Sequence, residues 1–306
     1  MYYNHKGFNR SAMKTKRLLN IGVWIFLHVK IFAENVLVVT SAYNRPDFIE
    51  VQYKTLKKFL LDEYEYVVFN DARDPSLQYE IENMCAKWNI RCINIPQSIH
   101  DLPYLERVPG EGFHDPAVRN ANVVQYALNS IGFDHNGIVT ILDSDMFLVK
   151  PFSIEDYLSG YEIGGVPQSY SKNGISIEYL WIGIAFLDMG KLPDKEKINF
   201  NCGRIKGVPV DAGGHTYDYL QSHPELNIRL FYARYFGNVS FDFKTDDLGL
   251  EDREIALLQS GMVNVEFFLN GTFFHYRSGT NWDYQTSAYH ENKTRIFNEY
   301  IQNILE

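Results

Sequence analysis

The sequence predicts an α/β protein with a doubly wound, mostly parallel sheet and helices on both of its faces. Short apolar runs rich in Val and Ile alternate with amphipathic stretches of helical spacing, which is the order expected of such a sheet. The runs show no polar alternation, as is typical of strands covered on both faces. Several runs end directly in polar residues, at the edge where ligands bind in open α/β sheets.

The first half of the chain supplies most of the predicted parallel strands. The apolar runs predict strands at residues 36–40, 66–69, 90–95 and 137–142. Pro46 begins a predicted helix whose apolar positions recur as far as Leu60, and further helices are predicted at 80–88 and 116–129. The segment from Pro96 to Pro116 is rich in Pro, Gly and His and is predicted to be a loop.

The second half of the chain is more mixed. Residues 179–187 predict an apolar strand interrupted by Gly183, residues 201–214 a glycine-rich loop, and residues 216–220 a short helix. A last strand is predicted at 265–276, with His275 near its end. No repeat, low-complexity linker or change in composition divides the chain, so residues 34–306 are predicted to form one domain.

The N-terminal residues are predicted to lie outside that domain. Basic residues at 14–17 precede an apolar stretch, residues 18–33, that ends in a small residue. This order is typical of a signal peptide or a short membrane anchor, although the stretch is short for a span and includes His28 and Lys30. Residues 1–33 are interpreted as such a segment, which implies export, the secretory pathway or membrane association, with a cytoplasmic protein as the alternative.

Composition excludes some classes of function. The net charge of −9 argues against a general nucleic-acid binder, because phosphate backbones favour clustered Lys and Arg. An acidic protein can still bind a nucleotide when a divalent cation bridges it to the phosphates. The three cysteines cannot form a disulfide framework, although a bridge between Cys85 and Cys92 is conceivable in an oxidising compartment.

The strongest chemical signal is the run Asp143-Ser144-Asp145, directly after the predicted strand 137–142. Two carboxylates separated by one residue can bind a divalent cation, which can in turn neutralise a diphosphate. The motif alone is common by chance, and a turn with two solvated aspartates is the alternative. Its position at the end of a buried strand makes a metal site the favoured interpretation.

A second signal begins at His275, near the end of the last predicted strand. Its imidazole can complete a carboxylate site for Mn²⁺ or Mg²⁺, although a histidine at a strand end can equally be structural. Arg277 and the flexible backbone at Ser278-Gly279 are candidates for holding phosphates.

Together these motifs resemble those of the GT-A glycosyltransferases, which move a sugar from a nucleotide diphosphate donor to an acceptor. The resemblance covers nearly all of the chain from Val36 to Trp282. It implies that Asp143 and Asp145, with Ser144 between them, bind the metal and the ribose. It also implies that the nucleoside is held by Thr40, Ser41, Ala42 and Tyr43, and that the base is contacted by Asp71.

Residues 275–282 resemble the H-x-x-G-x-x-K-P-W segment of the retaining branch that includes glycogenin and bacterial lipopolysaccharide galactosyltransferases. There the His is a metal ligand and the following residues clamp the diphosphate. This chain departs from the pattern, with Asn281 in place of the Lys and no Pro before Trp282, so phosphate neutralisation is assigned to Arg277. The resemblance also implies that Arg119 reaches the donor sugar with Asn122 beside it, a surface arginine being the alternative.

The catalytic carboxylate is left open between two segments. Asp211 lies where the retaining branch has an acidic residue beside the donor sugar, and residues 181–188 resemble a segment that lines that sugar. Glu251-Asp252 resembles the E-D motif of inverting enzymes, where a carboxylate deprotonates the acceptor hydroxyl. An exposed charged helix would explain that pair equally well. Retention with Asp211 beside the sugar is preferred, and inversion with Asp252 as base is the alternative.

The predicted function is metal-dependent transfer of a hexose from a nucleotide diphosphate sugar, preferably a UDP-sugar, to a saccharide, glycolipid or protein acceptor. A D-x-D-x-T phosphatase is disfavoured because Phe147 stands where Thr or Val is required. A sugar-1-phosphate nucleotidyltransferase and a dehydrogenase both need a glycine-rich loop after the first strand, where this chain has none. A sugar-binding protein without turnover is the non-enzymatic alternative.

Overall fold

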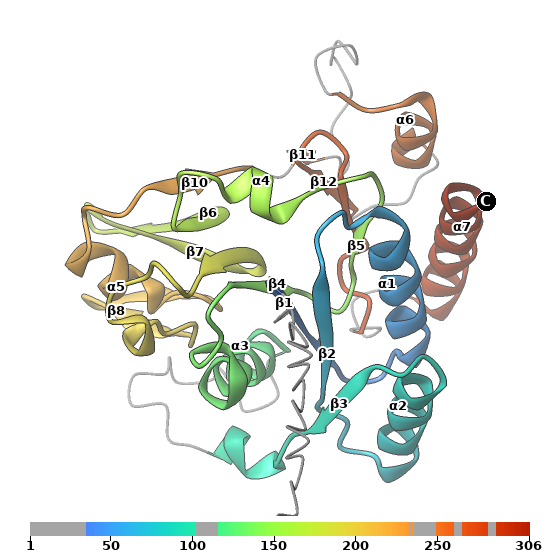
Figure 1. The fold of residues 1–306 in the computed structure, drawn as a ribbon, viewed down its shortest axis with the longest axis horizontal. Coiled ribbons are helices and arrows are strands. Elements are labelled where there is room, and N and C mark those ends of the chain that lie inside the picture. The colour runs from blue at the N-terminus through green and yellow to red at the C-terminus, as the bar shows by residue number, and fades with distance from the viewer. Residues whose placement is uncertain (1–34, 102–115, 233, 236–248, 260–264, 281–285) are drawn as a thin grey trace, which may run out of the picture. The chain divides into compact units, whose positions relative to one another are not determined.

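The computed structural model describes residues 35–101, 116–232, 234–235, 249–259, 265–280 and 286–306 (Figure 1). The predicted signal or anchor at residues 1–33 lies outside the described residues, as do Asn281 and Trp282. None of the helices in the described part of the chain combines the length and the apolar character that a membrane span requires.

A seven-stranded sheet forms the centre of the domain, in the order β10-β6-β7-β4-β1-β2-β3. Its strands are β1 (Val36–Ala42), β2 (Tyr64–Asn70), β3 (Arg91–Asn94), β4 (Ile138–Leu142), β6 (Ile163–Lys172), β7 (Ile175–Asp188) and β10 (Ile228–Leu230). β1 pairs in parallel with β2 and β4, β2 with β3, and β10 with β6. β7 runs antiparallel between β4 and β6. The predicted α/β class with a mostly parallel sheet is therefore confirmed.

Helices cover both faces of this sheet, as predicted. The α-helices of the described residues are α1 (Pro46–Phe59), α2 (Pro75–Lys87), α3 (Pro116–Ala127), α4 (Ile154–Leu158), α5 (Thr216–Ser222), α6 (Asp252–Gln259) and α7 (Ser287–Leu305), of which α6 packs on α7. Along β1, Val36 and Val38 pack into a core with α1, α2 and α7, whereas Leu37 and Val39 pack into a second core with α3. In Figure 1, α1, α2 and α7 accordingly lie on the opposite side of β1 and β2 from α3. Burial on both faces explains why β1 is apolar throughout.

A smaller antiparallel sheet has the order β11-β12-β13-β5. Its strands are β5 (Met146–Leu148), β11 (Arg234–Tyr235), β12 (Glu266–Phe268) and β13 (Phe273–His275), while β8 (Gly203–Ile205) and β9 (Val208–Val210) form a separate hairpin. The prediction of one strand at 265–276 was wrong. Asn270 and Gly271 adopt positive φ values of 55° and 81° and turn the chain back on itself, a conformation that these residue types tolerate. The turn places β12 beside β13 instead of in line with it.

Other element boundaries differ from the predicted ones for local reasons. The helix predicted at 80–88 begins at Pro75, because the Asp74 side chain accepts a hydrogen bond from the N–H of Ser76 at 2.7 Å and caps the helix. The strand predicted at 179–187 begins at Ile175 and forms a hairpin with β6, which the sequence patterns did not reveal. These differences lengthen elements without changing the order of the parallel strands.

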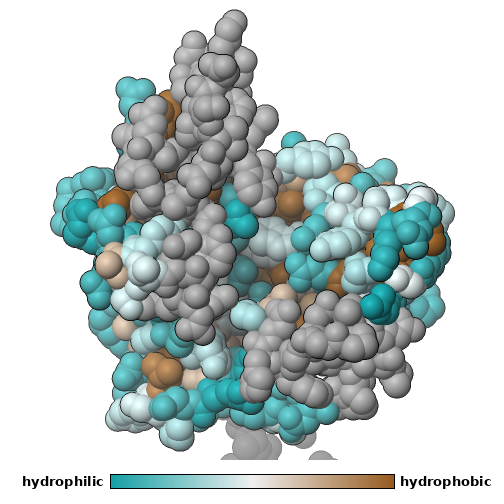
Figure 2. All heavy atoms as spheres, turned by 180° about the vertical axis from the view of Figure 1, so that it is seen from behind, coloured by the Kyte–Doolittle hydropathy of each residue, from teal (hydrophilic) through white to brown (hydrophobic). Residues whose placement is uncertain are grey.

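Among the coloured residues visible in Figure 2, hydrophobic ones occur in small separate areas between hydrophilic ones. The most exposed large hydrophobic side chains are Leu61, Tyr79 and Tyr232, which belong to different segments. Scattered apolar residues of this kind are normal on folded proteins.

Candidate metal and nucleotide site

The carboxyl ends of β1, β2 and β4 open onto a cavity of about 440 Å³. Most of the residues singled out in the sequence line it, namely Ser41, Tyr43, Asp71, Arg119, Asp143, Ser144, Asp145, Asp211, His275, Arg277, Ser278 and Gly279. They come from segments spread over the whole described chain, which the fold gathers at the ligand-binding edge expected for this class of sheet.

The three predicted metal ligands converge at this cavity. One side-chain ligand atom from each of Asp143, Asp145 and His275 lies within 4.8 Å of the others. The two aspartates follow β4, and the chain then continues into β5, which pairs antiparallel with β13 so that Met146 lies opposite His275. The N–H of Tyr276 extends this ladder by donating to the Asp145 carbonyl at 2.8 Å. This pairing explains why a histidine distant in sequence reaches the aspartates.

A fourth residue, Glu266, fixes the orientation of the imidazole. The β12–β13 hairpin places Glu266 directly opposite His275, and its Oε2 lies 2.8 Å from Nδ1 of that ring. The other ring nitrogen, Nε2, faces Asp145 Oδ1 at 3.2 Å. A carboxylate on the outer nitrogen is the usual support of a metal-ligating histidine. Two carboxylates and a supported imidazole fit Mn²⁺ or a similar divalent cation.

Sequence patterns did not reveal Glu266, because its partnership with His275 depends on the unrecognised turn between β12 and β13. A carboxylate inside an apolar run was the available signal. Only 4% of Glu266 is exposed, and its other oxygen lies 3.1 Å from Nη1 of Arg277. The buried charge is thus shared between a ring nitrogen and a guanidinium, which offsets part of its desolvation.

The site holds protons when no cation is bound. Burial and the neighbouring Asp145 raise the pKa of Asp143 to about 7. Burial also opposes ionisation of Asp145, but the adjacent His275 and the N–H of Gly279 hold its pKa below the usual value. Burial disfavours the imidazolium, yet Asp145 and Glu266 raise the pKa of His275 to about 9. A protonated imidazole therefore supplies the positive charge that a cation would bring to these carboxylates.

Two further side chains hold the first aspartate, and neither was predicted. Asn120 on α3 donates to Asp143 Oδ1 at 3.3 Å and accepts from the Ser41 hydroxyl at 2.9 Å. Gln52 on α1 is almost fully buried and donates to the carbonyls of Asp143 and Met146 at 2.7 and 2.8 Å. The turn that carries the two aspartates is thus held from both faces of the sheet.

On the other side of the cavity, Asp71 and Arg119 form a buried ion pair with 2.7 Å between Oδ2 and Nη2. The second oxygen of Asp71 lies 2.7 Å from Nε2 of His100. The Arg119 guanidinium also lies 5.0 Å from the Tyr43 ring centroid. Arg119 therefore lies beside the predicted base-binding residues as well as lining the cavity.

Three of the predicted nucleotide-binding residues do not line the cavity. Thr40 and Ala42 are buried, because alternate residues of β1 point to opposite faces and only Ser41 and Tyr43 face the cavity. Asn122 is also buried and donates to Nδ1 of His100 at 3.1 Å, behind the Asp71 pair. The structure thus places these three residues behind the cavity wall instead of on its surface.

The segment from Arg277 to Gly279 forms the wall of the cavity next to Asp145. Arg277 and Ser278 have φ values of 58° and 52°, which are uncommon for residues with a side chain. The N–H of Gly279 donates to Asp145 Oδ2 at 2.9 Å. A Cβ on Gly279 would come within 2.4 Å of Cε2 of Phe48, so the segment reaches Asp145 only because this residue is glycine.

The two candidate catalytic segments lie in different places. Asp211 follows β9 and lines the cavity together with Trp181 and Ile182. A close approach of Gly213 to β7 places this loop there, because any Cβ on Gly213 would come within 1.9 Å of the Leu180 carbonyl oxygen. Trp181 also packs against His275, the predicted metal ligand, with 5.3 Å between the ring centroids.

Glu251 and Asp252 are not brought to the cavity. Both are exposed at the start of α6, a helix that packs against α7. Glu251 lies 3.0 Å from Nη2 of Arg253 and 3.8 Å from Nζ of Lys150. These contacts describe a charged surface helix, which was the alternative interpretation of the pair.

Comparison with known proteins gives distant likenesses. No protein-family model and no curated protein matches the chain. The bifunctional glycosyltransferase WbbM aligns at 12% identity with a TM-score of 0.34, over 52% of this chain and 32% of that one. Core-mannan synthase A from Aspergillus fumigatus, in its Mn/GDP form, aligns at 8% identity and a TM-score of 0.36, over 51% and 59%. The galactosyltransferase LgtC, in complex with donor and acceptor sugar analogues, aligns at 11% identity with a TM-score of 0.41, over 87% of this chain and 95% of that one.

The chain therefore spans about a third and about three fifths of the length of the first two of these proteins. Their activities, substrates and metals belong to them. The function proposed for this chain rests on the geometry of its own cavity.

Proposed function

We propose that this protein is a metal-dependent GT-A glycosyltransferase that transfers a hexose from a nucleotide diphosphate sugar, preferably a UDP-sugar, to a saccharide, glycolipid or protein acceptor. The observation that carries the proposal is the convergence of Asp143, Asp145 and His275 at a cavity on the carboxyl edge of the sheet. That edge is where open α/β sheets bind nucleotides.

The proposed metal has a defined task in this cavity. Asp143, Asp145 and His275 would hold it, and a divalent cation would neutralise the donor diphosphate as it becomes the leaving group. Above about pH 7 and without a cation, the carboxylates of Asp143, Asp145 and Asp211 would repel the polyanion, because the protonated imidazole of His275 offsets only part of their charge. Binding of the nucleotide is therefore expected to require the metal.

The chain's own residues supply the remaining contacts. Ser41 and Tyr43 lie where they can meet the nucleoside, and the Arg277 side chain and the backbone of Ser278 lie where they can meet the phosphates. The reaction breaks the bond between the anomeric carbon and the phosphate oxygen. It forms a bond from the acceptor oxygen to the same carbon, and the acceptor hydroxyl passes its proton to the departing diphosphate.

We expect the anomeric configuration to be retained, with Asp211 beside the donor sugar. Its place in the cavity wall supports this assignment, since a carboxylate there can stabilise positive charge that develops on the sugar. Asp211→Asn should lower kcat by about a hundredfold, whereas Asp252→Asn at the exposed start of α6 should have little effect. A product of inverted configuration, identified by NMR, would contradict retention.

The test of the function itself is hydrolysis and transfer with a panel of nucleotide sugars, with Mn²⁺ and with excess chelator. Activity is expected only with the metal. The double variant Asp143→Asn/Asp145→Asn should abolish it, while Asp134→Asn, which removes an exposed carboxylate, should not. No turnover of any nucleotide sugar, together with no metal-dependent UDP binding by calorimetry, would refute the proposal.

A further inference from the structure

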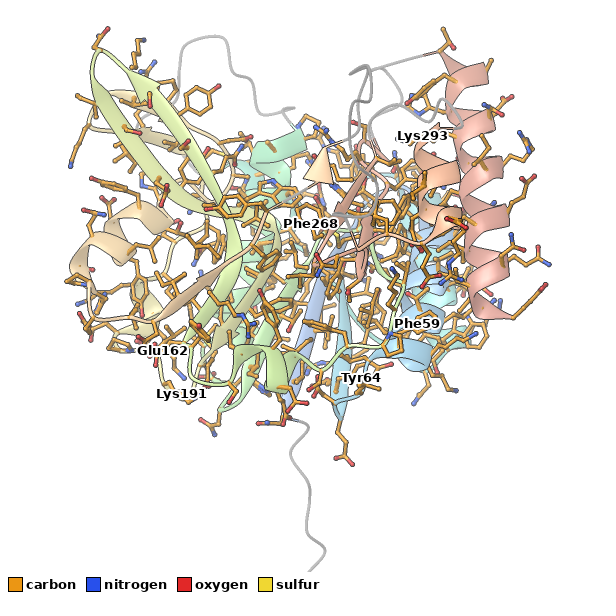
Figure 3. The ribbon with its side chains drawn as sticks, turned by 90° about the horizontal axis from the view of Figure 1, so that it is seen from above. Phe59, Tyr64, Glu162, Lys191, Phe268 and Lys293 are labelled. Atoms are coloured by element: carbon orange, nitrogen blue, oxygen red, sulfur yellow. The ribbon has the colours of Figure 1, made fainter. Side chains whose placement is uncertain are left out.

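Lys293 is a buried cation that the proposed function does not yet use. It lies on the inner side of α7 (Figure 3) and only 2% of the residue is exposed. Its ammonium donates to the carbonyl of Arg277 at 2.9 Å and lies 4.1 Å from the Tyr276 ring centroid. Among the residues that the structure describes, no carboxylate lies within 4.0 Å of it.

The carbonyl that Lys293 binds belongs to the cavity wall. In the same segment, the Gly279 carbonyl accepts from Nη1 of Arg45 at 3.1 Å, and the Thr280 carbonyl accepts from the Asn44 amide at 3.1 Å. Side chains from α7 and from the loop before α1 thus hold three carbonyls of one short segment. The segment needs such support, because left-handed backbone at Arg277 and Ser278 is unfavourable.

Stability alone does not explain a lysine at this position. Burying an ammonium without an ion pair carries a large desolvation penalty, and a hydrophobic residue of similar length commonly replaces such a group without loss of stability. One carbonyl and an aromatic face compensate the charge only in part. A buried cation that is costly to the fold and borders a ligand cavity points to a role in binding.

We propose that Lys293 is a positioning residue for the donor diphosphate. It holds the wall formed by Arg277, Ser278 and Gly279 in its binding conformation and adds positive charge behind it. This inference rests on the proposed function, because it assumes that the ligand at this wall is a nucleoside diphosphate bound with a divalent cation. It assigns the C-terminal helix a part in donor binding.

The test compares Lys293→Met with Arg295→Met, which removes one positive charge from the exposed face of the same helix. Affinity for UDP with Mn²⁺, affinity for Mn²⁺ alone and the melting temperature are measured for each full-length variant. In Lys293→Met, UDP affinity in the presence of Mn²⁺ should fall roughly tenfold, in the range seen for residues that support a ligand shell. Mn²⁺ affinity should stay within about twofold of the wild type, and the melting temperature should be equal or higher. Arg295→Met should match the wild type throughout.

Three outcomes would overturn the inference. Unchanged UDP affinity in Lys293→Met would remove the role in binding. A variant that unfolds or melts much earlier would assign Lys293 to stability instead, and an equal loss of affinity for Mn²⁺ alone would place its effect on the metal ligands. Failure of the wild-type protein to bind UDP with Mn²⁺ would instead contradict the proposed function, so the two failures are distinguishable.

Discussion

Metal binding at the proposed site should depend steeply on pH, because two of its three proposed ligands hold protons when no cation is present. Burial and Asp145 raise the pKa of Asp143 to about 7. Although burial opposes it, the carboxylates of Asp145 and Glu266 raise the pKa of His275 to about 9. A cation must displace both protons before it can use these ligands. Affinity for Mn²⁺ is therefore expected to rise with pH.

The size of the effect follows from the two pKa values. About pH 6 is one unit below the pKa of Asp143. Competition from the proton on this carboxyl therefore weakens Mn²⁺ binding about tenfold relative to about pH 8. His275 is below its pKa at both values and contributes about tenfold for each unit, or about a hundredfold over the interval. The two ligands together predict a change in Mn²⁺ affinity of up to about a thousandfold. Asp145 adds nothing in this interval, because its pKa is lowered from 3.8 and it is ionised throughout.

Calorimetric titration with Mn²⁺ at these two pH values measures the change directly. Repeating each titration in buffers of different ionisation enthalpy counts the protons released per cation, which should approach two at the lower pH and one at the higher. His275→Gln should bind Mn²⁺ more weakly and lose the larger part of the pH dependence. Equal affinities at both pH values, or no proton release, would refute the assignment of Asp143 and His275 as ligands.

Three other outcomes are expected. Glu266→Gln removes the carboxylate that orients His275 and should lower Mn²⁺ affinity at least tenfold with the fold intact; an unchanged affinity would contradict that role. Gly279→Ala places a Cβ within 2.4 Å of Phe48 and should lower the free energy of unfolding by about 1–3 kcal/mol in a denaturation experiment. An unchanged free energy of unfolding would contradict the close packing of Gly279 against Phe48. The metal-free protein should lose stability as pH rises from about 4 to about 8, because the raised pKa values of Asp143 and His275 make the folded state bind more protons than the unfolded chain, whereas Lys293, whose pKa burial lowers to about 8, opposes this trend only at higher pH. A melting temperature that rises over this range would contradict those shifts.

Much of the fold followed from local patterns in the sequence. The continuous apolar run of β1 reflects burial on both faces, and the polar residues that end β1, β2 and β4 meet at one edge because parallel strands align their carboxyl ends. The position of Asp143 and Asp145 in the site could therefore be predicted. The prediction that all four residues from Thr40 to Tyr43 contact the nucleoside did not take strand alternation into account. Successive side chains of a strand point to opposite faces, and Thr40 and Ala42 are buried.

The rest of the site depends on pairings between distant segments, which local patterns do not specify. The hairpin of β12 and β13 brings Glu266 opposite His275, and its turn lies inside an apolar run that resembles one strand. β5 is only three residues long, yet its pairing with β13 places the histidine beside the aspartates. A charged pair such as Glu251-Asp252 looks the same in sequence whether it faces a cavity or solvent. Only its place on α6 distinguishes the two cases.

An aromatic cluster explains how such a charged site is held in place. Phe147 of β5, Phe274 of β13 and Phe297 of α7 are all fully buried and pack on one another, with 4.8 Å between the ring centroids of Phe147 and Phe297 and 5.6 Å between those of Phe274 and Phe297. β5, which follows the two aspartates, and β13, which ends in His275, are therefore anchored to α7 by apolar contacts. Lys293 lies one helical turn before Phe297, so both side chains leave the same face of α7. One helix face thus contacts both the strand that carries His275, through Phe297, and the cavity wall after it, through Lys293, so the proposed metal site and the proposed diphosphate site share one support.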